Sequence, residues 1–189
     1  MSRTIGFALC GSFCTLTRTL AVMERMAKSG WDITPIVSDN CRTLDTRFGK
    51  AADYLDEITE LCGKPPLTTL QDVEPIGPKA LFDALVIAPC TGSTLARLSY
   101  GLSDTPQTLA AKSQLRIGRP VVLAVSTNDA LSGSAENIGR LLNRRGYYFV
   151  PMRQDAPQTK PRSMVAILEN IPETVEAALN GEQIQPILL

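Results

Sequence analysis

Short apolar runs that alternate with segments of helical periodicity constrain the fold of this 189-residue chain more than any other feature. The expected strands are residues 4–10, 33–37, 84–88, 121–125 and 147–150. Between and after them, apolar residues recur at helical spacing in residues 16–29, 51–62, 94–100, 108–115, 135–145 and 172–179. Strands that alternate with helices predict an α/β fold: a doubly wound parallel sheet in a flavodoxin-like or Rossmann-like three-layer sandwich.

The domain organisation expected from this pattern is a single domain over residues 1–189. A chain of this length forms one hydrophobic core without needing disulfides or metals. Residues 151–163 hold three prolines and show no clear periodicity, so they are expected to form an irregular arm. This arm and the apolar tail at residues 184–189 favour a homo-oligomer.

Composition excludes several classes of function. Lys+Arg and Asp+Glu are both 19, which gives no basic field for nucleic acid or for acidic lipid. The apolar runs are far shorter than the ~20 residues that span a bilayer, and no signal peptide is recognised. Five cysteines without C-x-x-C spacing fit a reducing cytosol, so we expect a cytoplasmic protein. With no histidine, a Ser–His or Cys–His pair and a His-ligated metal are excluded, and no metal site is expected.

Two loops rich in glycine and hydroxyl side chains follow the first and third strands. In the strand order 2-1-3-4-5, the winding direction reverses between these two strands, and ligands bind there. Both loops lead into helices, whose free N–H groups and positive dipole ends bind phosphate or a dicarboxylate. The alternative is that the hydroxyl residues are only N-caps. The candidate binding residues are Gly11, Ser12, Thr15, Thr91, Gly92, Ser93 and Thr94.

A third polar loop, residues 126–129, follows the fourth strand at the same edge of the sheet. Ser126 and Asn128 are candidate binding residues, because an amide both donates and accepts hydrogen bonds. Asp129 is the candidate general base. The alternative is that Asn128 and Asp129 only form a turn.

Arg47 and Lys79 are the candidate cations for an anionic ligand. Arginine suits a carboxylate because it binds it with two parallel hydrogen bonds. Arg47 follows the loop after the second strand, and Lys79 follows a stiff Pro-Ile-Gly-Pro segment. The alternative for each is an ordinary surface cation.

Cys14 lies at the expected start of the first helix, where the pKa of a thiol can be lowered. The alternative for this residue, as for Cys10 and Cys90, is a small buried apolar side chain.

The three polar loops together resemble the flavoprotein family of homo-oligomeric flavin-containing cysteine decarboxylases. The matching segments are Gly11-Ser12, residues 88–94 (APCTGST) and residues 126–129 (STND). Further strings are similar to one branch of that family, the B subunits of dipicolinate synthases. These strings are TRFG at 46–49, EPIGPK at 74–79, RPVVL at 119–123, STNDAL at 126–131 and QIQPIL at 183–188.

The resemblance implies an oxidoreductase subunit that helps to convert dihydrodipicolinate, or its hydrated precursor, to dipicolinate during sporulation. It implies a partner that binds NAD(P), the A subunit of the synthase. It also implies FMN as a possible cofactor and a location in the mother cell of a spore-forming bacterium. The chain departs from the decarboxylases in lacking their histidine and their Pro-x-Met-Asn segment, which argues against decarboxylation of a peptide cysteine.

Three hypotheses follow for the pocket between the polar loops. It binds the dicarboxylate directly, while the partner A subunit supplies the nicotinamide, or it holds FMN. In the third, the chain is a non-catalytic assembly or regulatory subunit with a vestigial flavin-type pocket.

Overall fold

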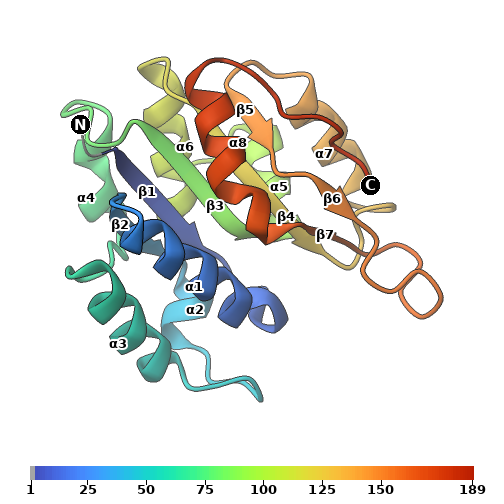
Figure 1. Cartoon of the computed structure of the whole chain (residues 1–189), viewed down its shortest axis with the longest axis horizontal. Helices are drawn as coiled ribbons and strands as arrows, with labels where there is room; N and C mark the ends of the chain where they lie inside the picture. Colours follow the sequence, from blue (N-terminus) through green and yellow to red (C-terminus); the bar gives the residue numbers. More distant parts are fainter. Residues whose placement is uncertain (1–2) are drawn as a thin grey trace.

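The computed structural model describes residues 3–189, which form a seven-stranded sheet between two layers of helices (Figure 1). The strands are β1 (Thr4–Leu9), β2 (Asp32–Val37), β3 (Ala84–Cys90), β4 (Val121–Thr127), β5 (Tyr147–Phe149), β6 (Met152–Arg153) and β7 (Met164–Ala166). The α-helices are α1 (Phe13–Lys28), α2 (Asp39–Thr43), α3 (Ala51–Cys62), α4 (Leu70–Val73), α5 (Gly92–Tyr100), α6 (Pro106–Arg116), α7 (Ala135–Leu142) and α8 (Ile171–Leu179). Two short 3₁₀ helices, η1 (Glu74–Ile76) and η2 (Leu168–Asn170), complete the fold.

The parallel part of the sheet has the order β2-β1-β3-β4-β5. This order confirms the predicted flavodoxin-like α/β fold, with the winding direction reversing between β1 and β3. The five predicted strands therefore point their carboxyl ends to one edge of the sheet.

The central strands are apolar on both faces because helices cover both faces. In β1, Phe7 packs in the core layer that includes α1 and α8, whereas Ala8 packs in the opposite layer with α5, α6 and α7. Figure 1 shows these two groups of helices on opposite sides of the sheet. Alternation along a strand places successive side chains on opposite faces, so a doubly covered strand reads as a continuous apolar run.

An antiparallel extension at the end of β4 differs from the sequence prediction. Residues 151–163 were expected to be an irregular arm, but Met152–Arg153 form β6 and pair with β7. Strand β7 in turn pairs antiparallel with the end of β4, with Val165 opposite Ser126 and Met164 opposite Thr127. Strands of two or three residues are too short to show a period of two, so the pattern could not reveal them.

The two outer edges of the sheet are each covered by a single bridged residue. Leu67 bridges to Ile36 of β2, and Leu188 bridges to Met152 of β6. The tail that was expected to be only apolar is thus hydrogen-bonded to the sheet, because the Met152 N–H donates to the Ile187 carbonyl at 2.8 Å. None of the helices within residues 3–189 has the length and hydrophobicity needed to cross a bilayer.

Candidate functional site

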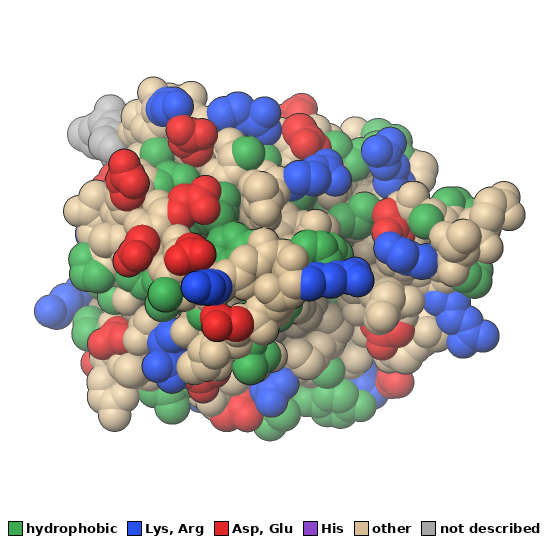
Figure 2. All heavy atoms as spheres, turned by 90° about the horizontal axis from the view of Figure 1, so that it is seen from below, with side chains coloured by type: hydrophobic (Ala, Val, Ile, Leu, Met, Phe, Trp, Pro, Cys, Tyr) green, Lys and Arg blue, Asp and Glu red, His purple; other side chains and the backbone are tan. Residues whose placement is uncertain are grey.

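A cavity of about 570 Å³ lies at the carboxyl ends of the strands, beside the start of α1. Figure 2 views this edge of the molecule, which is hollowed near its centre and has lysine and arginine side chains around the hollow. We call this space the main cavity. Its lining residues are Gly11, Ser12, Phe13, Cys14, Thr15, Arg47, Phe48, Thr91, Ser126, Thr127, Asn128, Asp155, Lys160, Ser163, Met164 and Val165.

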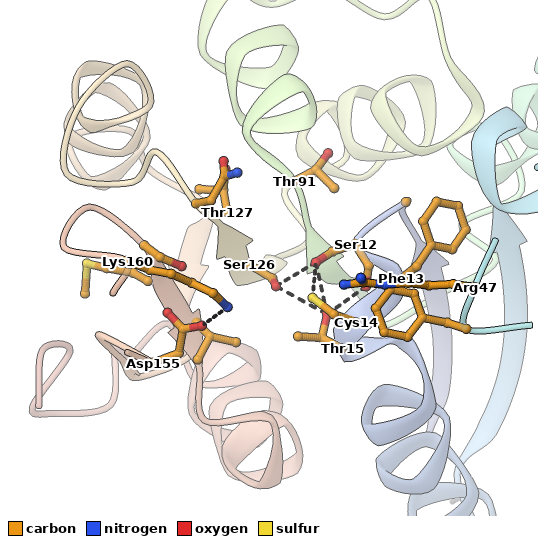
Figure 3. Close-up of a pocket in the computed structure, with 16 residues that line it drawn as sticks. Ser12, Phe13, Cys14, Thr15, Arg47, Thr91, Ser126, Thr127, Asp155 and Lys160 are labelled. Atoms are coloured by element: carbon orange, nitrogen blue, oxygen red, sulfur yellow. Dashed lines mark hydrogen bonds and ion pairs between the residues drawn. The ribbon is translucent and has the colours of Figure 1, made fainter. Parts of the chain in front are cut away.

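Three hydroxyl groups meet at the centre of this cavity (Figure 3). Ser12 Oγ lies 2.9 Å from Ser126 Oγ, and Thr15 Oγ1 lies 3.2 Å from each of these two oxygens. Thr15 also donates to the Ser12 carbonyl at 2.9 Å. We call Ser12, Thr15 and Ser126 the hydroxyl cluster. When one serine donates to the other, the second serine keeps a hydrogen to donate to a ligand.

Ser12 occupies the N-cap position of α1, but its side chain makes no capping hydrogen bond. Its hydroxyl bonds to Ser126 instead. The alternative that Ser12 is only a helix cap is therefore not what the structure shows. The first turn of α1 keeps backbone N–H groups that the helix itself cannot satisfy, and the positive end of a 16-residue helix lies beside the hydroxyl cluster. This arrangement favours an anionic ligand.

In the second predicted loop, residues 91–94, some side chains stabilise the start of α5 and others line a cavity. Thr91 is the N-cap of α5 and accepts a hydrogen bond from the Thr94 N–H at 3.4 Å. Thr94 is buried and donates to Cys10 Sγ at 3.5 Å. Thr91 alone among the four candidates of this loop lines the main cavity. The capping alternative thus describes Thr91, which also lines the cavity, whereas the Thr94 hydroxyl bonds to Cys10 in the core.

Asp129 faces a second, neighbouring cavity of about 470 Å³, which we call the side cavity. Its Oδ1 accepts hydrogen bonds from Thr127 at 2.6 Å and from Ser134 at 2.8 Å. Gly92 and Ser93 also line the side cavity, not the main one. Thr127 and Asn128 line both cavities, so the two spaces adjoin. The structure distributes the residues of the expected crevice over these two adjoining spaces.

The two predicted cations have different positions. Arg47 lines the main cavity, with its guanidinium 4.8 Å from the centre of the Phe48 ring. It forms no ion pair with any acidic residue in the described range 3–189. Lys79 is exposed and precedes β3, at the amino end of the strands, so the prediction that it joins this site is wrong. The stiff segment before it leads to the opposite edge of the sheet.

The sequence analysis did not identify Asp155 and Lys160 as site residues. Lys160 Nζ lies 3.1 Å from Asp155 Oδ2, and both residues line the main cavity. Burial alone would raise the pKa of Asp155, but the hydrogen bond from Ser163 and the Lys160 ammonium hold that pKa below its usual value. These residues reach the site because β7 pairs with the end of β4, and no sequence signal indicated that pairing.

The five cysteines divide by exposure. Burial raises the pKa of Cys10 to about 12, and it raises the pKa of Cys90 well above its usual value. Cys14, by contrast, is exposed and lines the main cavity. The structure thus agrees with the alternative that Cys10 and Cys90 are small buried side chains, because both thiols are enclosed in the core.

This contrast predicts the order in which the thiols are alkylated in the folded protein. At pH 8, Cys14 will react with iodoacetamide at least about tenfold faster than Cys10 or Cys90, because only an accessible thiolate reacts. Peptide mass spectrometry after timed quenching measures the rates. A ligand in the main cavity will slow labelling of Cys14, whereas slow labelling that no ligand affects would place Cys14 outside the ligand space.

Comparisons with known proteins agree with the fold of the chain. The model of the Flavoprotein family matches residues 1–176. The dipicolinate synthase B subunit of Bacillus subtilis (strain 168) is 40% identical over 187 residues, which cover 99% of this chain and 94% of that protein. The crystal structure of the dipicolinate synthase B subunit from Bacillus halodurans C has a TM-score of 0.91 at 42% identity, covering 100% of this chain and 98% of the other. The FMN-dependent cysteine decarboxylase SpaF shares the fold, with a TM-score of 0.69 at 20% identity, covering 94% of this chain and 97% of that one.

Proposed function

Because the chain belongs to the flavoprotein family and is similar to dipicolinate synthase B subunits along almost its whole length, we propose that it acts as the B subunit of a dipicolinate synthase. The enzyme would be an oxidoreductase that converts dihydrodipicolinate, or its hydrated precursor, to dipicolinate. We further propose that the A subunit of the synthase is the partner and binds NAD(P). The setting proposed for this reaction is the mother-cell cytoplasm during sporulation.

The observation that carries this proposal is the anion-binding character of the main cavity. The hydroxyl cluster offers a spare O–H donor, and the first turn of α1 offers unsatisfied N–H groups beside it. Arg47 adds a positive charge that no described acidic residue neutralises. Hydrogen bonds to a charged partner are about twice as strong as neutral ones, so these donors favour a carboxylate over a neutral group.

The oxidation of dihydrodipicolinate removes a hydride and a proton from the ring and leaves it aromatic, whereas the hydrated precursor must also lose a molecule of water. In the proposed reaction the hydride passes to NAD(P)⁺ held by the A subunit. We propose Asp129 as the acceptor of the proton by way of Thr127, because Thr127 lines the main cavity and donates its hydroxyl hydrogen to Asp129 Oδ1 at 2.6 Å. Its Oδ1 is occupied by two hydroxyl donors, whereas its Oδ2 accepts no hydrogen bond from a residue between 3 and 189.

FMN, which the family implies, fits the same donors. The hydroxyl cluster and the first turn of α1 would hold its phosphate, since both offer hydrogen-bond donors to an anion. Gly11 lines the cavity beside these donors, and a Cβ there would crowd Asn40 Cβ at 3.2 Å. Phe13 and Phe48 line the cavity and offer aromatic faces to a flavin ring. When bound, FMN supplies an acceptor for two electrons.

Two measurements test this proposal. Isothermal titration with dipicolinate asks whether the purified chain binds the product, and an absorption spectrum after addition of FMN and desalting asks whether it retains flavin. Dipicolinate formation is then assayed in the presence of NAD(P)⁺, with the A subunit either included or left out. Full-rate formation of dipicolinate by the isolated A subunit would contradict a catalytic role for this chain.

Ser126→Ala provides a matched test of the hydroxyl cluster. A hydrogen bond to a charged carboxylate contributes about 1.5–3 kcal/mol, so dipicolinate binding will weaken by about tenfold or more. Ser29→Ala is the control, because Ser29 is exposed at the other end of α1 and its hydroxyl donates to the Arg25 carbonyl at 2.9 Å. Unchanged dipicolinate synthesis by Ser126→Ala, measured together with the A subunit, would favour the assembly or regulatory role.

A further inference from the structure

We propose that Lys160 is the second cation of a clamp, opposite Arg47, that makes the main cavity selective for dicarboxylates over monocarboxylates. This inference rests on the function proposed above and assigns the residue that would recognise the second carboxylate.

The two cations approach the hydroxyl cluster from opposite walls. Figure 3 shows Lys160 on one side of Ser12 and Ser126 and Arg47 on the other, with both charged ends directed toward the space between them. Arg47 comes from the segment between α2 and α3, whereas Lys160 comes from the segment between β6 and β7. A ring with two separate carboxylates, such as the 2- and 6-carboxylates of dipicolinate, would meet one cation with each carboxylate.

The segment that carries Lys160 is held in place by its own hydrogen bonds. Gln154 Nε2 donates to the Pro161 carbonyl at 2.8 Å, and the Lys160 N–H donates to the Ala156 carbonyl at 2.7 Å. The Leu131 N–H donates to the Arg162 carbonyl at 3.0 Å and ties the segment to the loop after β4. Lys160 is therefore positioned before any ligand arrives, which lowers the entropic cost of using it.

Because Asp155 already pairs with Lys160, a ligand must compete with Asp155 for the Lys160 ammonium. The Asp155 carboxylate holds the Lys160 ammonium at 3.1 Å and also lines the main cavity. A ligand with one carboxylate is satisfied by Arg47 and the hydroxyl cluster, and it gains nothing by competing with Asp155. The second carboxylate of a dicarboxylate, by contrast, gains an interaction when it shares the Lys160 ammonium with Asp155 or replaces Asp155 beside it. Competition with Asp155 therefore limits binding at Lys160 to ligands that carry a second anionic group.

The experiment measures the affinities of dipicolinate and picolinate by isothermal titration and compares their ratio. In Lys160→Met the preference for dipicolinate will fall by about fivefold, a size appropriate to a half-exposed ion pair. Lys160→Arg will restore most of it. Asp155→Asn will raise the preference, because it frees the ammonium and removes a negative charge. Lys79→Met, a lysine outside both cavities, will leave the ratio unchanged.

A double variant separates the clamp from an indirect effect of charge. Lys160→Met leaves Asp155 unpaired, and that charge alone would repel a dicarboxylate. Asp155→Asn/Lys160→Met removes both groups, so a persistent loss of preference supports direct recognition by Lys160. Recovery of the wild-type ratio in the double variant would overturn the clamp.

The remaining outcomes distinguish the two proposals. Wild-type protein that binds neither dipicolinate nor picolinate would overturn the proposed function and the clamp together. Wild-type protein that prefers dipicolinate, with the same preference in Lys160→Met, would overturn the clamp and leave the proposed function standing.

Discussion

Arg47→Met will weaken dipicolinate binding by about tenfold or more, because a hydrogen bond to a charged group contributes about 1.5–3 kcal/mol. The guanidinium lines the main cavity, stacks on the Phe48 ring and has no acidic partner among residues 3–189. Its charge is therefore available to a ligand without the loss of another interaction. Methionine keeps a similar apolar stem, so the change removes mainly the charge and its donors.

Arg42→Met is the control for Arg47, and both variants are titrated with dipicolinate under the same salt conditions. Arg42 lies in α2, pairs with Asp39 at 2.9 Å and does not line the main cavity. An equal loss in both variants would indicate only an effect of net charge. No loss in either would exclude Arg47 from the site.

Gly92→Ala will lower the free energy of unfolding by about 1–3 kcal/mol, the usual cost of an overpacked position. A Cβ at Gly92 would lie 2.7 Å from Ser134 Oγ, 2.9 Å from Thr127 Oγ1 and 3.0 Å from Asp129 Oδ1. These three atoms are held by mutual hydrogen bonds of 2.6 and 2.8 Å, so they cannot move apart without losing those bonds. This cost outweighs the gain of up to about 1 kcal/mol that alanine brings to a helix.

Gly139→Ala is the matched control and is expected to have the opposite sign. Gly139 lies inside α7, and a Cβ there would meet no atom within 4 Å. Alanine will therefore stabilise the protein by about 0.5–1 kcal/mol. Urea unfolding of both variants measures the difference. Stabilisation by both substitutions would show that the atoms around Gly92 rearrange easily, which would weaken the case for a fixed Asp129.

The parts of the fold that were predictable from the sequence are those with a strong period. The central strands β1, β3 and β4 are buried on both faces, so each appears as an apolar run, and α1 and α3 show clear helical spacing. The order of the strands followed from general rules for α/β sheets, and the polar loops at the switch point led to Ser12 and Ser126.

The parts that could not be predicted depend on pairing between distant segments. The sequence places Lys160 in an irregular arm, because only the pairing of β7 with the end of β4 brings it to the main cavity. Lys79 was expected at the site because its neighbours are stiff, yet stiffness does not say toward which edge of a sheet a segment leads. The loop residues were likewise expected in one crevice, whereas the structure distributes them over two adjoining cavities that share Thr127 and Asn128.

The bridge between the chain end and β6 has a practical consequence for protein engineering. Ile187 and Leu189 both hydrogen-bond to Met152, at 2.8 and 3.1 Å, so the last residues fasten the hairpin that presents Lys160. A fusion partner or affinity tag joined after Leu189 would start beside these two hydrogen bonds and could break them. A deletion of residues 184–189 would bare the edge of β6 and let another chain add a strand there.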